Sequence, residues 1–325
     1  MMKLAIIGAG LSGLSLATLL KGKADITVFD KARGVGGRMS TRRAEPYFFD
    51  HGAQYFTART EAFKQFIEPY VRDGLIQRWD ADYALLKGEE IVERRDWALF
   101  EPRYVAVPGM NSFAKHLAES VNVKVNAKVQ PLEAGNKWRL LDKGGNDLGV
   151  FDWVVSTAPV PQTTELLPSS FKHHSDIQAI EMLPSFSLML GFSKPISLPY
   201  EAAHVEESNV SWLAINNSKP ERRGHTLLVH SSSDYASEHI DGDKETILRD
   251  LIAETSRITG CDVSAAEYKT LHGWRYANNV GRDQLGPFLD TEMQLAACGD
   301  WCVGGRVEGA FIAAHRLAEA IKSLL

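Results

Sequence analysis

Cysteine is scarce in this chain, and it has neither a long apolar run nor an excess of basic residues. The three cysteines, Cys261, Cys298 and Cys302, lack the paired spacing of a zinc site or a disulfide framework, which fits a reducing compartment. Lys and Arg number 36 against 41 Asp and Glu, and this net charge of −5 argues against a nucleic-acid surface. No apolar run reaches the roughly 18 residues of a membrane span, and the apolar start, Leu4–Ile7, has neither the basic flank nor the length of a secretory signal. We therefore expect a soluble cytoplasmic protein without a metal site.

The first thirty residues have the pattern of a dinucleotide-binding fold. Lys3–Ile7 is predicted to be a buried strand, Leu14–Leu20 a helix and Asp25–Phe29 a second strand. Between the first strand and the helix lies the loop Gly8-Ala9-Gly10-Leu11-Ser12-Gly13. A strand, a glycine-rich turn, a helix and another strand are the context in which such a loop binds a dinucleotide.

Each glycine of this loop has a physical task. Gly8 permits the tight turn, Gly10 lets the main chain approach a pyrophosphate, and Gly13 lets the helix pack closely on the strand. Main-chain N–H groups at the start of the helix then face the anion. Asp30 follows Gly10 by 20 residues, where an acidic residue accepts hydrogen bonds from the adenosine ribose. This carboxylate argues against a 2′-phosphate in the same site.

A second glycine-rich segment follows directly and reads Lys31-Ala32-Arg33-Gly34-Val35-Gly36-Gly37-Arg38. Arg38, behind two glycines, is predicted to make a charge-assisted contact with the same pyrophosphate. Arg33, Arg42 and Arg43 are interpreted as a solvated basic turn.

The rest of the chain predicts a second lobe that interrupts the nucleotide-binding domain. At roughly 150 residues per domain, 325 residues suggest two domains. After Gln294 the chain again shows a short predicted strand followed by a glycine, as it does near its start. A last helix is expected from Gly309. We expect residues 1–57, 105–160 and 291–325 to form the nucleotide-binding domain, and residues 58–104 and 161–290 a substrate domain.

These motifs resemble the FAD-binding framework of flavin amine oxidases and their relatives. The resemblance rests on the first glycine loop, the segment Arg33–Arg38 and the C-terminal motif Gly299-Asp300 with Val307-Glu308-Gly309-Ala310. The segment Phe49-Asp50-His51-Gly52-Ala53-Gln54-Tyr55-Phe56-Thr57 is similar, more narrowly, to renalases, especially the bacterial ones. The resemblance implies an α/β fold: a Rossmann-type FAD-binding domain with an inserted α+β substrate domain, the architecture of flavin amine oxidases and p-hydroxybenzoate hydroxylase.

The resemblance also implies FAD, held without a covalent bond, and a set of residues that bind it. These are Gly8, Ala9, Gly10, Ser12, Gly13, Asp30, Lys31, Gly36, Gly37, Arg38, Gly52, Ala53, Gln54, Tyr55, Val129, Gly299, Asp300, Val307, Glu308, Gly309 and Ala310. Within this set, Ser12 and Arg38 match positions at the pyrophosphate, Gln54 and Tyr55 positions beside the flavin, and Val129 the residue whose main chain pairs with the adenine.

The C-terminal motif is expected to lie at the other end of the cofactor. By resemblance Asp300 takes a ribityl or pyrophosphate-side hydroxyl, and Gly309 and Ala310 place the N-terminus of the last helix toward flavin N1 and O2. A helix N-terminus stabilises the negative charge that a reduced flavin carries there. Cys302 has no tyrosine after it, unlike the cysteine that carries FAD in some amine oxidases, and is interpreted as a buried thiol. Ala313-Ala314 departs from the family's Ser-Gly, a difference of packing only.

The substrate residues are less sharply defined. Trp274 and Arg275 resemble a renalase segment, and an aromatic ring beside a guanidinium suits a flat, anionic ligand. His230, at a predicted strand end, completes the candidate catalytic group. The run Asn216–Lys219 is interpreted first as a turn and second as a ligand loop. No lysine can be equated with the one that amine oxidases keep near flavin N5, which weakens an amine substrate.

Three functions follow as hypotheses. The first is an FAD-dependent oxidase of the 2- and 6-dihydro isomers of NAD(P)H, with O2 as acceptor and NAD(P)+ and H2O2 as products. This hypothesis rests on the resemblance and on the single dinucleotide fingerprint. If FAD occupies the site of that fingerprint, a nicotinamide nucleotide must bind elsewhere, as a substrate. The second is an amine oxidase or a desaturase-like enzyme acting on an apolar substrate. The third is a flavin-binding redox sensor without turnover.

Overall fold

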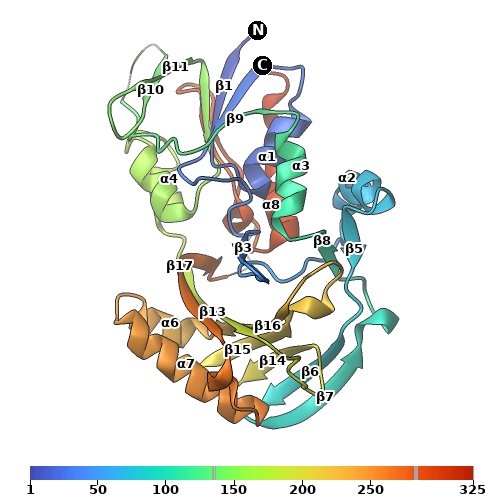
Figure 1. The fold of residues 1–325 in the computed structure, drawn as a ribbon. Helices are drawn as coiled ribbons and strands as arrows, with labels where there is room; N and C mark the ends of the chain where they lie inside the picture. The colour runs from blue at the N-terminus through green and yellow to red at the C-terminus, as the bar shows by residue number, and fades with distance from the viewer. Residues whose placement is uncertain (134, 136, 282–284, 325) are drawn as a thin grey trace. The chain divides into compact units, whose positions relative to one another are not determined.

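The structure is a computed structural model that describes residues 1–133, 135, 137–281 and 285–324. The chain divides into two compact units (Figure 1). The nucleotide unit comprises Met1–Met39, Phe113–Met182 and Asn278–Leu325, and the sheet unit comprises Ser40–Ser112 and Leu183–Ala277. Residues 40–57, expected in the FAD-binding domain, lie in the sheet unit because Tyr47 and Phe49 pack against Met189 and Leu228 there. The assignment of a function to each domain stays a prediction.

The nucleotide unit contains a six-stranded sheet in the order β18-β19-β12-β1-β2-β9. Its pairs are parallel except for β18 with β19. The strands of the sheet are β1 (Lys3–Ile7), β2 (Asp25–Phe29), β9 (Asn122–Lys124), β12 (Trp153–Ser156), β18 (Phe288–Asp290) and β19 (Leu295–Ala297). A parallel sheet of this kind presents the carboxyl ends of its strands as a ligand-binding edge.

The predicted strand, loop, helix and strand at the N-terminus are confirmed. Strands β1 and β2 have the predicted bounds, and the helix α1 (Leu11–Leu19) begins inside the glycine loop. In Figure 1, α1 lies beside the last helix, α8 (Val307–Ile321), and the two helices pack on each other. The helix α8 begins at Val307, two residues before its predicted start at Gly309.

The other elements of this unit are short. They are α4 (Val160–Leu166), α5 (His174–Gln178), the 3-10 turn η4 (Asp300–Cys302) and the hairpin β10 (Trp138–Leu141) with β11 (Asp147–Phe151). The helix α3 (Asn111–Ala118) begins in the sheet unit and ends in the nucleotide unit.

The sheet unit is built on seven strands in the order β17-β13-β16-β15-β14-β6-β7. Their bounds are β6 (Asp82–Lys87), β7 (Glu90–Asp96), β13 (Met182–Phe192), β14 (Ala202–Glu206), β15 (Val210–Ile215), β16 (His225–Ser231) and β17 (Tyr268–Asn279). Two helices, α6 (Ser233–His239) and α7 (Lys244–Thr259), pack on this sheet (Figure 1). The core between them includes Leu251 of α7 against Leu190 and Val229, all fully buried.

The predicted helix Asp243–Thr259 is confirmed as α7. Asp243 caps it, because its side chain accepts a hydrogen bond from the main-chain N–H of Thr246, and Gly260 ends it in the left-handed conformation. The smaller elements are β3 (Thr41–Ala44) with β4 (Tyr47–Asp50), β5 (Ile76–Arg78) with β8 (Tyr104–Ala106), α2 (Glu61–Arg72), and the turns η1 (Trp97–Leu99), η2 (Asn216–Ser218) and η3 (Val263–Ala265). Over the described residues, none of the helices has the length and apolarity that crossing a membrane requires.

Candidate cofactor and substrate site

The glycine loop of the nucleotide unit is closed on one side and open on the other. A Cβ atom at Gly13 would lie 2.0 Å from the carbonyl oxygen of Gly8, so the helix approaches the strand as closely as glycine allows. A Cβ atom at Gly10 would meet nothing within 4 Å. Gly10 thus leaves space for a ligand beside the start of α1, which is what a pyrophosphate site requires.

Asp30 stabilises this loop from the end of β2. Its carboxylate accepts hydrogen bonds from the main-chain N–H groups of Ala9 and Ala32, both at 2.7 Å. Each carboxylate oxygen has a second lone pair, so these bonds leave acceptor capacity for a ribose hydroxyl. The predicted contact with the ribose stays a prediction.

The second glycine-rich segment joins the first loop and the C-terminal motif. The N–H of Gly36 donates to the carbonyl of Ala9 at 2.8 Å, and a Cβ atom at Gly37 would lie 3.5 Å from the Cα of Gly10. Arg38 forms a two-point ion pair with Asp300, with its Nη1 at 3.0 Å and its Nη2 at 2.5 Å from the two carboxylate oxygens. The structure therefore brings two of the predicted cofactor residues together from opposite ends of the chain.

The start of α8 has an unusual main chain. Gly304, Gly305 and Arg306, directly before the helix, have φ angles of 86°, 79° and 72°. Positive φ is unfavourable for a non-glycine residue such as Arg306, and strain of this kind is concentrated at functional sites. Val307, Glu308, Gly309 and Ala310 form the first turn of the helix, and Glu308 and Gly309 are buried.

Val129 has the geometry that the predicted adenine contact needs. It forms an isolated antiparallel bridge with Asp142, in which Lys128 O and Gln130 N carry the hydrogen bonds. In such a bridge the main-chain N–H and C=O of Val129 point to the opposite side. These groups are therefore directed away from the bridge partner.

The cysteines near the predicted FAD site are core residues. Burial raises the pKa of the Cys298 thiol to about 12 and raises that of Cys302 well above its ordinary value. The Cys298 sulfur lies 3.5 Å from the hydroxyl of Ser12. A buried thiol with a raised pKa is a poor nucleophile, which supports a non-covalent cofactor.

In the sheet unit, the segment Asp50–Tyr55 organises the candidate substrate side. The Gln54 amide donates to the carbonyls of Asp50 and Gly52, at 2.5 and 2.9 Å, and its Oε1 accepts from Lys219 at 3.0 Å. An ammonium has only donors, so Lys219 holds the amide with its oxygen toward the amine. Gly52 and Ala53 lie between the two ends of this turn.

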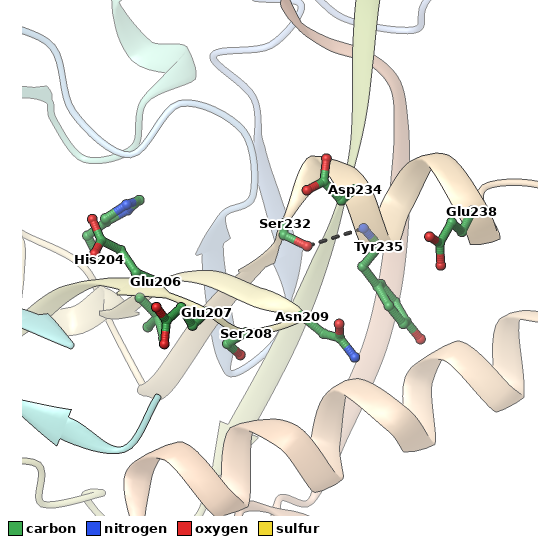
Figure 2. A pocket seen from close by; sticks show the side chains of 10 residues that line it. His204, Glu206, Glu207, Ser208, Asn209, Ser232, Asp234, Tyr235 and Glu238 are labelled. Carbon is green, nitrogen blue, oxygen red and sulfur yellow. Dashed lines mark hydrogen bonds between the residues drawn. The ribbon is translucent and has the colours of Figure 1, made fainter. Parts of the chain in front are cut away.

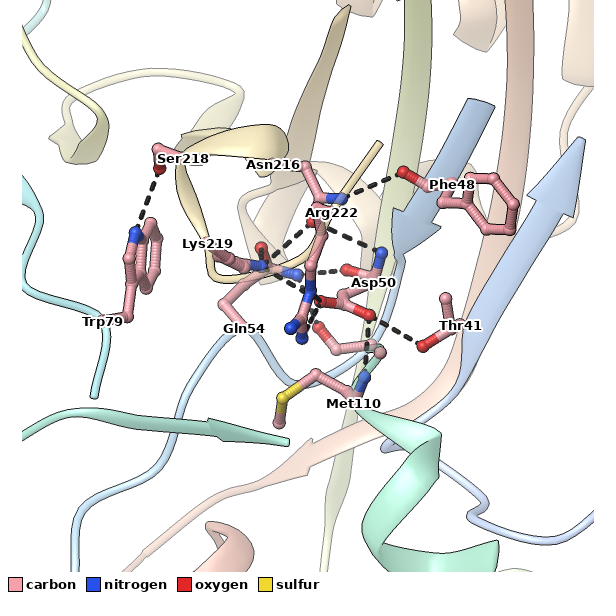
Figure 3. A network of polar contacts seen from close by, with 12 residues as sticks. Thr41, Phe48, Asp50, Gln54, Trp79, Met110, Asn216, Ser218, Lys219 and Arg222 are labelled. Carbon is pink, nitrogen blue, oxygen red and sulfur yellow. Dashed lines mark hydrogen bonds and ion pairs between the residues drawn. The ribbon is translucent and has the colours of Figure 1, made fainter. Parts of the chain in front are cut away.

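A buried ion network surrounds Gln54 (Figure 3). Asp50 accepts two hydrogen bonds from Arg222, at 2.8 and 3.0 Å, and lies 3.6 Å from Lys219. Burial alone would raise the pKa of Asp50, but the charges of Lys219 and Arg222 hold it below its ordinary value. Burial lowers the pKa of Lys219 to about 7, opposed by Asp50 and assisted by Arg222.

The interpretation of Asn216–Lys219 as a turn is confirmed by η2, but it missed two buried side chains. Asn216 donates to the carbonyl of Phe48 at 2.9 Å, and its Oδ1 accepts from Lys219 at 3.1 Å. A run of polar residues is typical of an exposed turn, so the pattern gave no sign of their burial.

Trp274 and His230, both predicted to be catalytic, lie near His51. The Trp274 ring stacks on the His51 ring at 5.2 Å, and its Nε1 donates to the His51 carbonyl at 2.9 Å. Ser187 donates to the same carbonyl at 2.6 Å and is the cross-strand partner of His230. Burial, with the charges of His272 and Arg42, lowers the pKa of His51 to about 3.

The pKa of His230 is lowered too, to about 4, by burial and by the charge of Lys219. His51 and His230 are therefore neutral imidazoles at neutral pH, and the His51 ring stacks on the indole of Trp274. Neutral, flat rings of this kind suit stacking on another flat ring.

Arg275 does not join this group. Successive side chains of a strand point to opposite faces, so Arg275 lies on the other face of β17 from Trp274. Its side chain is exposed and forms an ion pair with Asp241. A role of Arg275 in substrate binding stays a prediction.

Tyr55 belongs to an aromatic cluster that the sequence did not indicate. Its ring centroid lies 5.0 Å from that of Trp97, 5.8 Å from Trp212 and 6.3 Å from Trp79. Arg103 lies over the Trp97 ring at 4.3 Å. These residues come from distant parts of the sheet unit, so no local pattern links them.

The sheet unit also has a hollow lined by acidic side chains (Figure 2). Glu206, Glu207, Asp234 and Glu238 contribute to its lining. None of the predicted cofactor or catalytic residues lines it. The hollow is therefore separate from the candidate site.

Comparison with known protein families shows the family to which the chain belongs. Residues 95–322 match the family described as flavin containing amine oxidoreductase. The chain belongs to the flavin-containing amine oxidoreductase family. Residues 6–69 of this amine oxidoreductase family member also match an NAD(P)-binding Rossmann-like domain. The predicted cofactor, FAD held without a covalent bond, agrees with both matches.

Solved structures confirm the fold class of this flavin-containing oxidoreductase. A putative protoporphyrinogen oxidase from Exiguobacterium sp. 255-15 superposes with a TM-score of 0.79 at 13% identity, covering 100% of this chain and 99% of that one. Wild-type putrescine oxidase bound to putrescine superposes with a TM-score of 0.74 at 14% identity, covering 99% of each chain. At such identities the likeness shows the architecture and not the substrate.

Among curated proteins, the similarity to this oxidoreductase is short. The 4,4'-diapophytoene desaturase (4,4'-diaponeurosporene-forming) of Staphylococcus aureus strain Newman is 33% identical over 78 residues. The match covers 21% of this chain and 16% of the desaturase. The comparisons thus place the chain in a family of flavin-dependent oxidoreductases and leave its substrate open.

Proposed function

We propose that this protein is an FAD-dependent oxidase of the 2- and 6-dihydro isomers of NAD(P)H, as the renalase resemblance implies. Its products would be NAD(P)+ and hydrogen peroxide, with O2 as the acceptor and the cytoplasm as its location. When bound, FAD accepts hydride from the substrate and passes the electrons on to oxygen. The protein supplies binding, orientation and charge.

The observation that carries this proposal is the charge balance beside Gln54. Within the described chain, one carboxylate, Asp50, forms ion pairs with both Lys219 and Arg222. Asp50 is therefore already neutralised and has no charge left for a substrate ammonium. With Lys219 protonated the three groups carry a net positive charge, which repels a cationic amine and favours the phosphates of a dinucleotide.

The rings near His51 support a flat substrate. Trp274 is held by its hydrogen bond to the His51 carbonyl, and the stacked pair offers a rigid aromatic surface. Offset stacking on such a surface contributes about 0.5–1.5 kcal/mol beyond the area it buries. We assign Trp274 to substrate stacking, and His230 to the support of His51 through Ser187.

The nucleotide unit supplies the FAD contacts of this proposal. The open side of Gly10, the N–H groups at the start of α1 and the Arg38–Asp300 pair support a pyrophosphate there. The turn before α8 supports an anionic flavin edge at Val307–Ala310. Gln54 and Tyr55 are assigned to the flavin by resemblance.

The test is to mix the purified FAD-loaded protein anaerobically with a partly isomerised NADH preparation. The absorbance of the visible flavin band is recorded over time. We expect fast bleaching that consumes the isomers and leaves β-NADH largely intact. Readmission of air should restore the band and release one H2O2 per isomer oxidised.

Other outcomes would overturn the proposal. Bleaching by putrescine or another amine, and not by the isomers, would establish an amine oxidase. Tight FAD binding with no bleaching by either class would favour the sensor hypothesis. Equal rates with β-NADH and with the isomers would contradict the stated selectivity.

A further inference from the structure

Lys219 is a buried titratable group to which the proposed reaction assigns no step. Its side chain is fully buried in the sheet unit, where Figure 3 shows its amine facing Gln54, Asn216 and Asp50. The distances from Nζ to their oxygens are 3.0, 3.1 and 3.6 Å. An ammonium has three N–H donors, and three oxygen acceptors surround this one. The pocket is thus shaped for the protonated amine.

The charges around the amine favour the neutral form instead. Arg222 already donates two hydrogen bonds to Asp50, and Thr41 and the Met110 N–H donate to its other oxygen. Asp50 and Arg222 therefore balance each other without Lys219. A proton on Lys219 adds one uncompensated charge to a buried network, which is unfavourable.

These two effects nearly cancel, so the proton of Lys219 is easily gained or lost. The charged and titratable groups that face the amine are Asp50, Arg222 and His230, and the Trp79 ring lies 5.0 Å from Nζ. Asp50 and the ring favour the ammonium, whereas burial and the charge of Arg222 oppose it, and His230 is neutral at neutral pH. The pKa of about 7 reflects this balance.

We propose that Lys219 is a positioning residue that takes up a proton from water when negative charge arrives beside Gln54. This inference rests on the proposed function, in which Gln54 lies next to the cofactor. The amine nitrogen forms one new N–H bond as an O–H bond of water breaks and leaves hydroxide in the solvent. The amine becomes an ammonium, and the lysine is neither oxidised nor reduced. The added charge offsets the arriving negative charge.

The same proton holds the Gln54 amide. A charged donor strengthens the hydrogen bond to Gln54 Oε1, while both amide N–H groups stay on the carbonyls of Asp50 and Gly52. The amide therefore cannot turn over while Lys219 is charged. Charge compensation and orientation are coupled through one group.

The first test measures the lysine itself. The full-length protein, labelled with 13C at lysine Cε, is titrated by NMR, and the Lys219 signal is the one missing in Lys219→Met. We expect a transition near pH 7. Lys64→Met, which removes an exposed lysine of α2, should leave that transition unchanged. A Lys219 transition in the ordinary range of lysine, near pH 10, would overturn the inference.

The second test measures proton uptake on reduction without any substrate. The midpoint potential of bound FAD is followed from about pH 7 to about pH 9, with reduction by light and a mediator dye. We expect the potential of the wild type to fall more steeply with pH than that of Lys219→Met or Lys219→Arg. The arginine variant keeps the charge at all these pH values, so its potential should stay higher than that of the methionine variant.

Equal slopes in the wild type and the variants would refute proton uptake by Lys219. If Lys219→Met does not fold, the comparison of the wild type with Lys219→Arg carries the test. Neither measurement uses a nicotinamide or an amine, so failure of the proposed substrate leaves both results valid.

Discussion

Arg38 and Asp300 are 262 residues apart in the chain and meet in a two-point ion pair in the nucleotide unit. Each residue was predicted to contact FAD, and the ion pair shows that their side chains lie in contact within the nucleotide unit. The carboxylate orients the guanidinium, which places a charged, planar donor in the nucleotide unit.

We therefore expect Arg38→Ala to weaken FAD binding by about 10- to 100-fold, the equivalent of the ~1.5–3 kcal/mol of a charge-assisted hydrogen bond. Fluorescence titration of the FAD-free protein with FAD measures this constant. Arg33→Ala, which removes an exposed arginine of the same segment, is the control and should bind FAD as the wild type does. Full retention of affinity in Arg38→Ala would refute the pyrophosphate contact.

His230 makes stability depend on pH. Its pKa is about 4 in the folded protein and 6.5 in the unfolded chain, so between these values the unfolded chain binds more protons. Stability is therefore lost as the pH falls from about 6.5 to about 4. The contribution is at most about 3–4 kcal/mol, from ~1.4 kcal/mol per pKa unit.

His230→Gln should reduce this loss, as measured by denaturant unfolding at pH 7 and at pH 4. His204→Gln, which changes an exposed histidine, is the control and should retain the wild-type dependence. Identical pH dependence in His230→Gln and the wild type would show that His230 is not held neutral.

At the scale of elements, two glycines in the turn from β1 into α1 have different roles, one in packing and one in the predicted cofactor site. Gly13 has no room for a side chain, whereas Gly10 faces open space. Both glycines follow from one sequence motif, but their substitution should have different consequences.

Gly13→Ala should destabilise the protein, because its Cβ atom would lie 2.0 Å from the Gly8 carbonyl oxygen. Gly10→Ala should leave the unfolding midpoint of the FAD-free protein nearly unchanged and lower FAD affinity at least tenfold. Thermal unfolding of the FAD-free variants and FAD titration measure the two effects. Unchanged FAD affinity in Gly10→Ala would place the pyrophosphate elsewhere.

The strand β17 separates the two neighbouring residues that the sequence grouped as catalytic. Trp274 stacks on His51, whereas Arg275 forms an exposed ion pair with Asp241. We expect Trp274→Ala to slow flavin reduction by the dihydronicotinamide isomers at least tenfold, and Arg275→Ala to change it less than threefold. Stopped-flow reduction of the FAD-loaded variants measures both rates. A larger loss in Arg275→Ala would restore its predicted role in substrate binding.

At the scale of the whole molecule, the fold class and the order of the terminal elements were predictable. The opening pattern and the return of strand and glycine signals near the C-terminus indicated one sheet assembled from distant segments, and β1, β12 and β19 confirm it. The seven-stranded sheet was not predicted as a whole, because it places β6 and β7 beside β14 although residues 97–181 lie between β7 and the next strand of the sheet.

Removal of FAD should lower the thermal unfolding midpoint of the whole chain. A ligand that binds only the folded state adds about 2.7 kcal/mol at a concentration one hundred times its dissociation constant. Added FAD should restore the midpoint in a concentration-dependent manner, as scanning calorimetry can measure. Adenosine at the same concentration is the control and should restore less.

The sequence by itself determined the FAD-binding framework, since a glycine loop, an acidic strand end and a helix start are local features with local causes. The tertiary structure alone decided the candidate substrate side. Asp50, Lys219 and Arg222 form one network only after β4 packs beside the turn η2, and no spacing in the chain indicates that contact. The same holds for the Tyr55 cluster. Burial sets the charge of Lys219, and burial is a property of the packed chain rather than of the residue.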